Sequence, residues 1–209
     1  MSAAQVSEHY FAGEPAAAHR PGTVHLLLGD LHLELATDSG VFSSRRLDPG
    51  TRLLVEAAPP PPMAGDLLDL GCGYGPLALV LAARAPAARV WAVDVNSRAL
   101  ALTGANARRA GLANVTCAAP DDDLPATFDL IWSNPPVRIG KDALHALLAR
   151  WLTRLAPQAA AYLVVQRNLG SDSLQRWLAE AGWTAERAAA RSGYRMLRVS
   201  RGGQAVAPR

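Results

Sequence analysis

Cysteine and lysine are scarce in this sequence. The two cysteines, Cys72 and Cys117, stand 45 positions apart and have neither CxxC nor zinc-type histidine spacing. This pattern argues against a disulfide framework and against a zinc site, so we expect free thiols and no bound metal. Lys141 is the one lysine among 21 basic residues.

Long apolar runs are also missing. No stretch approaches the roughly 18 residues that a membrane span requires, and residues 1–11 lack the basic and apolar segments of a secretory signal. We therefore expect a cytoplasmic protein without membrane association. Of the 209 residues, 50% are hydrophobic and 19% are charged. A chain of this length and composition can bury a real core, and one domain with a small appendage is expected.

Acidic residues are absent from the C-terminal end, where arginine is frequent. The arginines that follow Glu186 are Arg187, Arg191, Arg195, Arg198, Arg201 and Arg209. A basic end favours a polyanionic partner. The alternative is an ordinary solvated charged face, and the sequence leaves both readings open.

Two short segments precede the main domain. Residues 24–36 alternate apolar and polar side chains on both sides of Gly29-Asp30, which predicts a β-hairpin. A short helix is predicted after Asp48 and must end at the four prolines of residues 59–62. The expected organisation is a loosely ordered lead-in at 1–22, a hairpin-and-helix appendage at 23–58 and a main domain at 63–203.

Short apolar strands alternate with longer helical segments in the main domain. Strands are predicted at residues 66–70, 89–94, 114–118, 128–133, 161–166, 183–190 and 194–200. Helices are predicted at residues 76–84, 98–110, 141–155 and 173–181. This alternation predicts an α/β fold with a mostly parallel sheet, helices on both faces and an antiparallel last strand. Ligands of such sheets bind beyond the carboxyl ends of the strands.

The strongest motif reads DLGCGYGP and begins at Asp69. Gly71, Gly73 and Gly75 leave a backbone without Cβ atoms at the start of a helix, where a bulky ligand can approach. A nicotinamide site would have GxGxxG spacing, whereas this motif has GxGxG spacing and an acid before it. An acid there suits a cation, such as the sulfonium and ammonium groups of S-adenosylmethionine. The alternative is a tight turn with no ligand.

Two further acids follow predicted strands. Asp94 ends the next strand, where an acid commonly accepts the ribose hydroxyls of an adenine nucleoside. Its alternative is a charge at a helix start, with Asn96 or Ser97 as the cap. Asp121 is the first of three aspartates after the third strand. We expect it to accept the adenine amino group, although a solvated acidic loop is the alternative.

The sequence Ser133-Asn134-Pro135-Pro136 follows another predicted strand. Consecutive prolines fix the backbone and remove two donors, which leaves a rigid set of acceptors beside the Asn134 amide. If the Asn134 oxygen and the Pro135 carbonyl each accept one N–H bond, an exocyclic amine is held with its lone pair towards the methyl donor. A neutral amine attacking a sulfonium needs no general base beforehand. The alternative is a plain Asn-Pro turn.

Together these motifs resemble those of the RsmC-type ribosomal RNA guanine-N2 methyltransferases, within the small methyltransferase domain family. The motifs that carry the resemblance are DLGCGYGP from Asp69, Asp94-Val95-Asn96, SNPP from Ser133, Gly140-Lys141, TDSGVFS from Thr37 and LDPGT from Leu47. The resemblance implies a class I S-adenosylmethionine fold, S-adenosylmethionine as cofactor, and ribosomal RNA or the small ribosomal subunit as partner. Two-domain members carry a further degenerate copy that 209 residues cannot contain, so the chain looks like the single-domain branch.

The resemblance also implies roles for individual residues. The cofactor site is expected to comprise Asp69, Gly71, Cys72, Gly73, Gly75, Asp94, Val95, Asn96, Asp121 and Asn134. The catalytic residues are expected to be Asn134, Pro135 and Pro136. Many amino-methylating relatives have an aromatic residue after the two prolines, whereas Val137 stands here, so stacking on the base is expected from Phe42. Arg138 and Lys141 are expected to contact RNA phosphates, with a surface helix start as the alternative.

Competing functions keep part of this chemistry. An adenine N6 amine or a protein glutamine amide would suit the same acceptors, and the sequence does not separate them from guanine. An inactive cofactor-binding RNA module is disfavoured by the intact Asp69 and Asn134-Pro135-Pro136. A nicotinamide dehydrogenase ranks lowest, because no histidine, tyrosine or lysine stands at the strand ends where a proton would move.

Overall fold

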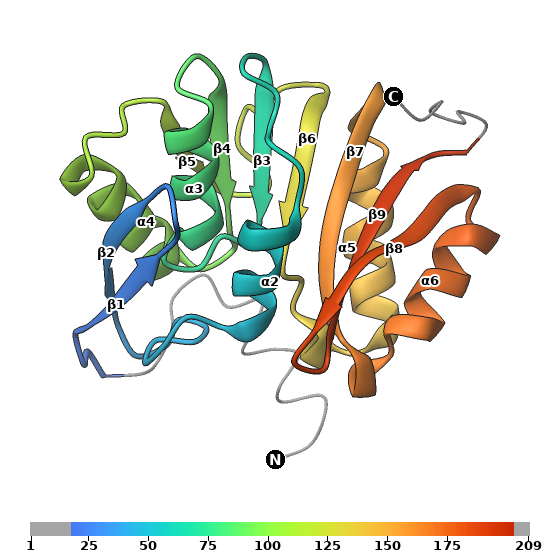
Figure 1. The fold of residues 1–209 in the computed structure, drawn as a ribbon, viewed down its shortest axis with the longest axis horizontal. Helices are drawn as coiled ribbons and strands as arrows, with labels where there is room; N and C mark the ends of the chain where they lie inside the picture. Colours follow the sequence, from blue (N-terminus) through green and yellow to red (C-terminus); the bar gives the residue numbers. More distant parts are fainter. Residues whose placement is uncertain (1–17, 203–209) are drawn as a thin grey trace.

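The computed structural model describes residues 18–202. Most of the predicted lead-in, and Arg209, therefore lie outside the described residues. The main body is a seven-stranded sheet in the order β5-β4-β3-β6-β7-β9-β8 (Figure 1). Its strands are β3 (Asp66–Leu70), β4 (Arg89–Val93), β5 (Val115–Ala118), β6 (Phe128–Ser133), β7 (Leu155–Gln166), β8 (Trp183–Arg191) and β9 (Tyr194–Arg201).

Parallel pairing dominates this sheet. The pairs β3–β4, β4–β5, β3–β6 and β6–β7 are parallel, and β9 is antiparallel to both of its neighbours. The predicted α/β fold, with a mostly parallel sheet and an antiparallel last strand, is confirmed. The carboxyl ends of β3, β4 and β6 meet at one edge, as ligand binding in such sheets requires.

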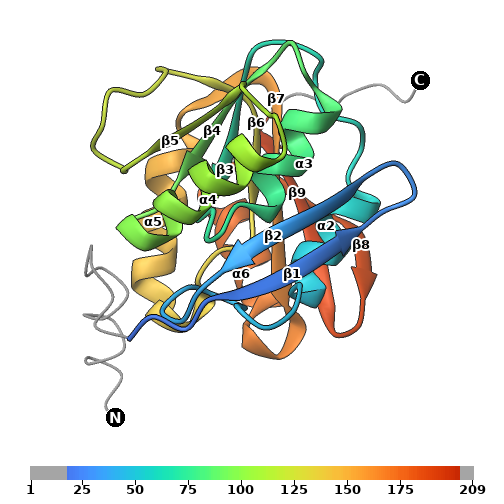
Figure 2. The ribbon, with the colours of Figure 1, turned by 90° about the vertical axis from the view of Figure 1, so that its left-hand side faces the viewer.

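Helices cover both faces of the sheet (Figures 1 and 2). They are α2 (Pro49–Ala57), α3 (Pro76–Arg84), α4 (Ser97–Arg109), α5 (Lys141–Leu152) and α6 (Ser171–Glu180), with 3-10 turns η1 (Val137–Ile139) and η2 (Arg167–Leu169). A hydrophobic core lies on each face of the sheet, and side chains of β3 point alternately into the two cores. Leu67 packs with α2 and α3, whereas Leu68 and Leu70 pack with α5 and α6. Among the described residues, no helix has the length and apolar character needed to cross a bilayer.

The predicted hairpin is confirmed as β1 (Gly22–Leu27) and β2 (His32–Thr37), an antiparallel pair outside the main sheet. Leu26 and Leu35 are fully buried in the core that contains α3. The Asn106 side chain on α4 accepts a hydrogen bond from the Ala36 amide at 2.8 Å and donates to the Ala36 carbonyl at 2.9 Å. The hairpin is therefore anchored beside α4, which brings the segment after it to the end of β3 (Figure 2). The three-part division of the chain stays a prediction.

Several predicted boundaries are wrong. Strand β7 begins at Leu155 rather than at residue 161, and α5 ends at Leu152 rather than at residue 155. Leu155 pairs with Phe128, and a register shift then follows around Pro157, where a missing amide donor is tolerated. Helix α6 begins at Ser171, earlier than predicted, because the preceding Gly170 adopts φ 104°.

Several arginines of the C-terminal end are held by contacts within the fold. Arg191 forms an ion pair with Glu56, Arg195 with Asp172, and Arg198 with Glu186 at 3.8 Å. Arg201 donates to the carbonyls of Thr153 and Leu155. These contacts give part of the arginine run a structural role, and binding of a polyanion by this end stays a prediction.

Candidate active site

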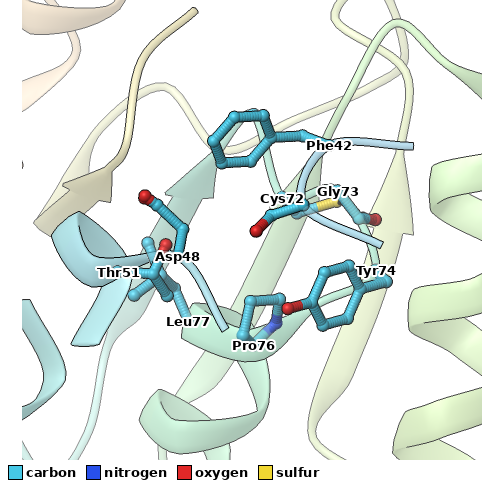
Figure 3. A pocket seen from close by; sticks show the side chains of 10 residues that line it. Phe42, Asp48, Thr51, Cys72, Gly73, Tyr74, Pro76 and Leu77 are labelled. Carbon is cyan, nitrogen blue, oxygen red and sulfur yellow. Dashed lines mark hydrogen bonds between the residues drawn. The ribbon is translucent and has the colours of Figure 1, made fainter. Parts of the chain in front are cut away.

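A pocket lies at the carboxyl edge of the sheet (Figure 3). It is formed by the loop before α2, the first turn of α2, the glycine loop between β3 and α3, and the first turn of α3. The lining residues are Phe42, Ser43, Asp48, Thr51, Gly71, Cys72, Gly73, Tyr74, Pro76 and Leu77. In Figure 3 the side chains of Asp48 and Thr51 face Cys72, Gly73 and Tyr74 across the pocket, with Phe42 at its rim.

The glycine loop has a left-handed backbone at each of its three glycines. The φ angles of Gly71, Gly73 and Gly75 are 75°, 58° and 92°. A Cβ on Gly75 would lie 2.8 Å from Thr103 Cγ2, so this glycine is required by packing against α4. A Cβ on Gly73 would meet no atom within 4 Å. Gly73 therefore satisfies the backbone conformation and leaves the space in front of the loop open.

Asp94 lies directly beside this loop. Its Oδ2 accepts a hydrogen bond from the Gly73 amide at 2.9 Å, and its Oδ1 accepts one from the Asn96 amide at 2.9 Å. Burial raises the pKa of Asp94, while hydrogen bonds from the amides of Asn96, Gly73 and Val95 act in the opposite direction. The structure thus brings the predicted ribose acid and the predicted glycine loop together.

Asn96 is the N-cap of α4. Its side-chain oxygen accepts from the amides of Arg98 at 3.0 Å and Ala99 at 3.3 Å, and its Nδ2 donates to the Gly40 carbonyl at 2.9 Å. Arg98 adds a hydrogen bond to the Ser39 carbonyl at 2.8 Å. The start of α4 therefore holds the loop that carries Phe42. Cofactor contact by Val95 or Asn96 stays a prediction.

Asp69 lies beneath the glycine loop and is fully buried. Its Oδ2 accepts from the Ala78 amide at 2.8 Å, and its Oδ1 has no hydrogen-bond partner in the described part of the chain. Burial raises its pKa to about 8, against the effect of the Ala78 hydrogen bond. Direct contact with a cation, as expected from the sequence, would require the loop to move, since no part of this carboxyl group reaches the pocket surface.

Asn134 is tied to the other wall of the pocket. Its Nδ2 donates to Thr51 Oγ1 at 3.0 Å and to Asp48 Oδ2 at 3.3 Å. Asp48 caps α2 by accepting from the Gly50 amide. Burial raises the pKa of Asp48, and hydrogen bonds from Gly50, Asn134 and Tyr194 oppose that shift. Both hydrogens of the Asn134 amide are thus engaged, and its oxygen is left as an acceptor.

The two prolines after Asn134 continue into the turn η1. The Pro135 carbonyl accepts from the Val137 amide at 2.8 Å, and the Pro136 carbonyl accepts from the Ile139 amide at 3.1 Å. The predicted carbonyl acceptors therefore already have one hydrogen bond each. A carbonyl oxygen has a second lone pair, so Pro135 keeps the capacity to accept one more.

The predicted RNA-contacting residues are spread more widely. Phe42 is 64% exposed at the pocket rim, and Lys141 is exposed at the start of α5. Val137 is partly buried against the core that contains α5. The side chain of Arg138 lies outside the described part of the structure. Asp121, assigned to adenine, has an 89% exposed side chain that pairs with Arg150 at 2.7 Å.

Sequence reasoning gave no role to Asp48 and Thr51. Both stand in the LDPGT motif, whose residue types alone indicate no more than a helix start. They lie more than 80 positions before Asn134, at separations of 86 and 83. A cap signal at the start of α2 was the available sign, and it does not indicate what else the carboxylate contacts.

The strand order, the glycine loop and the acid at the end of β4 define a class I S-adenosylmethionine-dependent methyltransferase. Its family follows from comparison with known proteins. The chain belongs to the methyltransferase small domain family, whose profile matches residues 32–198. The family resemblance inferred from the motifs and the cofactor class are thereby confirmed.

Similar proteins include both uncharacterized and named members. The chain is 35% identical over 172 residues to the uncharacterized protein YbxB of Bacillus subtilis (strain 168). The aligned residues cover 80% of this chain and 86% of YbxB. It is 36% identical over 127 residues to ribosomal RNA small subunit methyltransferase C of Aeromonas hydrophila. The aligned residues cover 60% of this chain and 36% of that protein.

Solved structures show the same fold. The 16S rRNA N2 G1207 methyltransferase RsmC of T. thermophilus, solved with AdoMet and guanosine, superposes with a TM-score of 0.69 at 24% identity. The match covers 90% of this chain and 52% of that one. The chain thus spans about half, or less, of the ribosomal RNA methyltransferases described here.

Proposed function

We propose that this methyltransferase modifies the exocyclic N2 amine of a guanine in 16S ribosomal RNA. The observation that carries the proposal is the orientation of Asn134: its NH2 group is bound by Asp48 and Thr51, so its oxygen is available to a hydrogen-bond donor. An exocyclic amine offers two N–H donors. The Asn134 oxygen and the Pro135 carbonyl would each accept one.

The residues around the glycine loop fit the cofactor. The open space in front of Gly73 would admit the methionine end, and Asp94 would accept the ribose hydroxyls. Asp121 would accept the adenine amino group. We assign Asp69 a supporting role, since it holds the Ala78 amide behind the loop. When bound, S-adenosylmethionine supplies a methyl group on a sulfonium, which reacts with a neutral nucleophile.

The chain's own groups would orient the nucleophile. Two hydrogen bonds from the amine to fixed acceptors draw the nitrogen towards tetrahedral geometry and direct its lone pair out of the ring plane. Transfer to this nitrogen would exchange the carbon–sulfur bond of the cofactor for a carbon–nitrogen bond and would leave S-adenosylhomocysteine. The methylated nitrogen carries a positive charge and releases one proton to water. Acceptor dipoles that face this nitrogen stabilise the charge as it develops.

RNA would be held at the pocket rim. Phe42 presents an exposed ring on which a base can stack, and the exposed Arg45 and Arg46 follow in the same loop. Lys141 lies beyond the acceptor segment, where it can meet a phosphate. The ribosomal RNA methyltransferases among the relatives support the same class of substrate.

One experiment tests the proposal. The protein is incubated with methyl-tritiated S-adenosylmethionine and separate pools of small ribosomal subunits, naked ribosomal RNA and total protein, and labelled RNA is digested to nucleosides. We expect label in N2-methylguanosine. Label in N6-methyladenosine or in protein glutamine would replace the guanine assignment, and no label in any pool would contradict the proposed function.

A further inference from the structure

The side-chain amide of Asn134 has two possible orientations of nearly the same shape. A half-turn about its last bond exchanges the oxygen with the NH2 group, and so exchanges an acceptor for a donor. Only the orientation with the NH2 group on Asp48 and Thr51 leaves the oxygen free to accept from an amine. The site therefore needs a neighbouring group that makes the other orientation unfavourable.

Asp48 is placed to do this. Its Oδ2 lies 3.3 Å from Asn134 Nδ2. An ionised carboxylate only accepts hydrogen bonds, so a half-turn of the amide would set two oxygens against each other. Thr51 Oγ1, at 3.0 Å from the same nitrogen, has a hydroxyl that can donate as well as accept and does not discriminate alone.

The carboxylate of Asp48 is itself held firmly. It is only 4% exposed, and both of its oxygens lie within hydrogen-bond distance of the Gly50 amide, at 3.3 and 3.2 Å. Tyr194 of β9 provides a further hydrogen bond. The first turn of α2 packs so closely on that ring that a Cβ on Gly50 would lie 2.6 Å from Tyr194 Cδ1. The amide of Asn134 thus contacts a carboxylate that is buried and hydrogen-bonded to Gly50 and Tyr194.

We propose that Asp48 is a positioning residue that binds the NH2 group of Asn134, keeps the amide oxygen free to accept, and so makes the site select an NH2 group. This inference rests on the proposed function and adds to it the source of selectivity. A ring nitrogen or a carbonyl oxygen in the same place would face the Asn134 oxygen, lone pair against lone pair. The site would then favour amines over every acceptor atom of a base.

A double-mutant cycle tests the pairing. Asp48→Asn keeps a good helix cap and nearly the same volume but weakens the acceptor. We expect it to lower kcat by roughly tenfold, the scale for one charge-assisted hydrogen bond, with unchanged affinity for S-adenosylhomocysteine. Asn134→Asp alone places two carboxylates together and should lose more activity.

The double variant Asp48→Asn/Asn134→Asp restores one donor and one acceptor in exchanged places. We expect its kcat to exceed that of Asn134→Asp alone. Asp38→Asn is the matched control, because Asp38 is a buried carboxylate of the same segment that binds Arg20 and Ser39 amides and not Asn134. The fold-change in kcat caused by Asp38→Asn should multiply with the fold-change caused by Asn134→Asp. If the fold-changes in kcat of Asp48→Asn and Asn134→Asp also multiplied in the double variant, the positioning role of Asp48 would be overturned.

Wild-type transfer measured in the same series separates the two proposals. If the wild type methylates an amine other than guanine N2, the substrate assignment fails and the cycle is run on that amine. If the wild type transfers no methyl group, the side-chain NH2 signals of Asn134 in 15N NMR decide the inference, with Asn134→Ala giving their assignment. We expect Asp48→Asn to shift these signals and to speed their hydrogen exchange. Unchanged signals would overturn the role of Asp48.

Discussion

The carboxylate of Asp94 accepts a hydrogen bond from the backbone amide of Gly73, at 2.9 Å, across 21 positions of sequence. The acid that ends β4 therefore fixes the loop that ends β3. A molecule bound across both strand ends would depend on Asp94 twice, once for direct hydrogen bonds and once for the shape of the loop.

Replacement of Asp94 by alanine should weaken the binding of S-adenosylhomocysteine. We expect a loss of roughly 1 to 3 kcal/mol, the scale for charge-assisted hydrogen bonds, measured by isothermal titration calorimetry. Asp30→Ala is the control, because Asp30 pairs with Arg84 on the surface of the hairpin turn. Unchanged affinity in Asp94→Ala would remove Asp94 from the cofactor site.

Gly73 and Gly111 offer a matched pair of substitutions. Their φ angles are 58° and 70°, and an added Cβ would meet no atom within 4 Å at either position. Alanine should lower the free energy of unfolding at both by roughly 1 to 2 kcal/mol, because the left-handed backbone disfavours a side chain. Only Gly73→Ala should also weaken S-adenosylhomocysteine binding. Equal binding by the two variants would show that the space in front of Gly73 is not the cofactor site.

The sequence predicted the sheet and the positions of the motifs because both depend on local patterns. Apolar runs of strand length and glycines with positive φ leave a signal within a few residues, as at Asp69 to Gly75. The contacts of Asn134 with Asp48 and Thr51 leave no such signal, because they join segments more than 80 positions apart. The burial of Asp69 and the pairing of Arg191 with Glu56 likewise arise only when strands and helices pack.

Stability should depend on pH through Asp69. Burial raises the pKa of this carboxyl to about 8 in the folded protein, against about 3.9 for an aspartate in an unfolded chain. The folded state holds the proton more tightly, so the contribution to stability is complete below about pH 4 and is lost as the pH rises through about 8.

Asp69→Asn should accordingly reduce the fall in melting temperature between about pH 5 and about pH 8. Thermal unfolding followed by circular dichroism measures this fall. Asp121→Asn, at an exposed position, serves as the control. A wild-type melting temperature that rises over this range, or an equal fall in Asp69→Asn, would contradict the assignment.

Phe42 should contribute to RNA binding through stacking. Phe42→Ala is expected to weaken binding of the methylated RNA segment by roughly 1 to 3 kcal/mol, the scale for one base on an aromatic ring, with unchanged S-adenosylhomocysteine affinity. Leu27→Ala is the matched control, since Leu27 is an exposed apolar residue of the hairpin. Fluorescence anisotropy of the labelled RNA segment gives the RNA affinity of each variant. Equal RNA binding by the two variants would leave the stacking partner to be found elsewhere.

The proposed mechanism depends most on Asn134, whose oxygen would hold the amine during transfer. The most direct test compares Asn134→Ala with the wild type in single-turnover methylation of RNA, alongside calorimetric binding of S-adenosylhomocysteine. We predict nearly unchanged cofactor affinity and a rate of methyl transfer lower by roughly 10²-fold or more, the loss expected when one preorganised transition-state hydrogen bond is removed. Methylation by Asn134→Ala at the wild-type rate would contradict the mechanism.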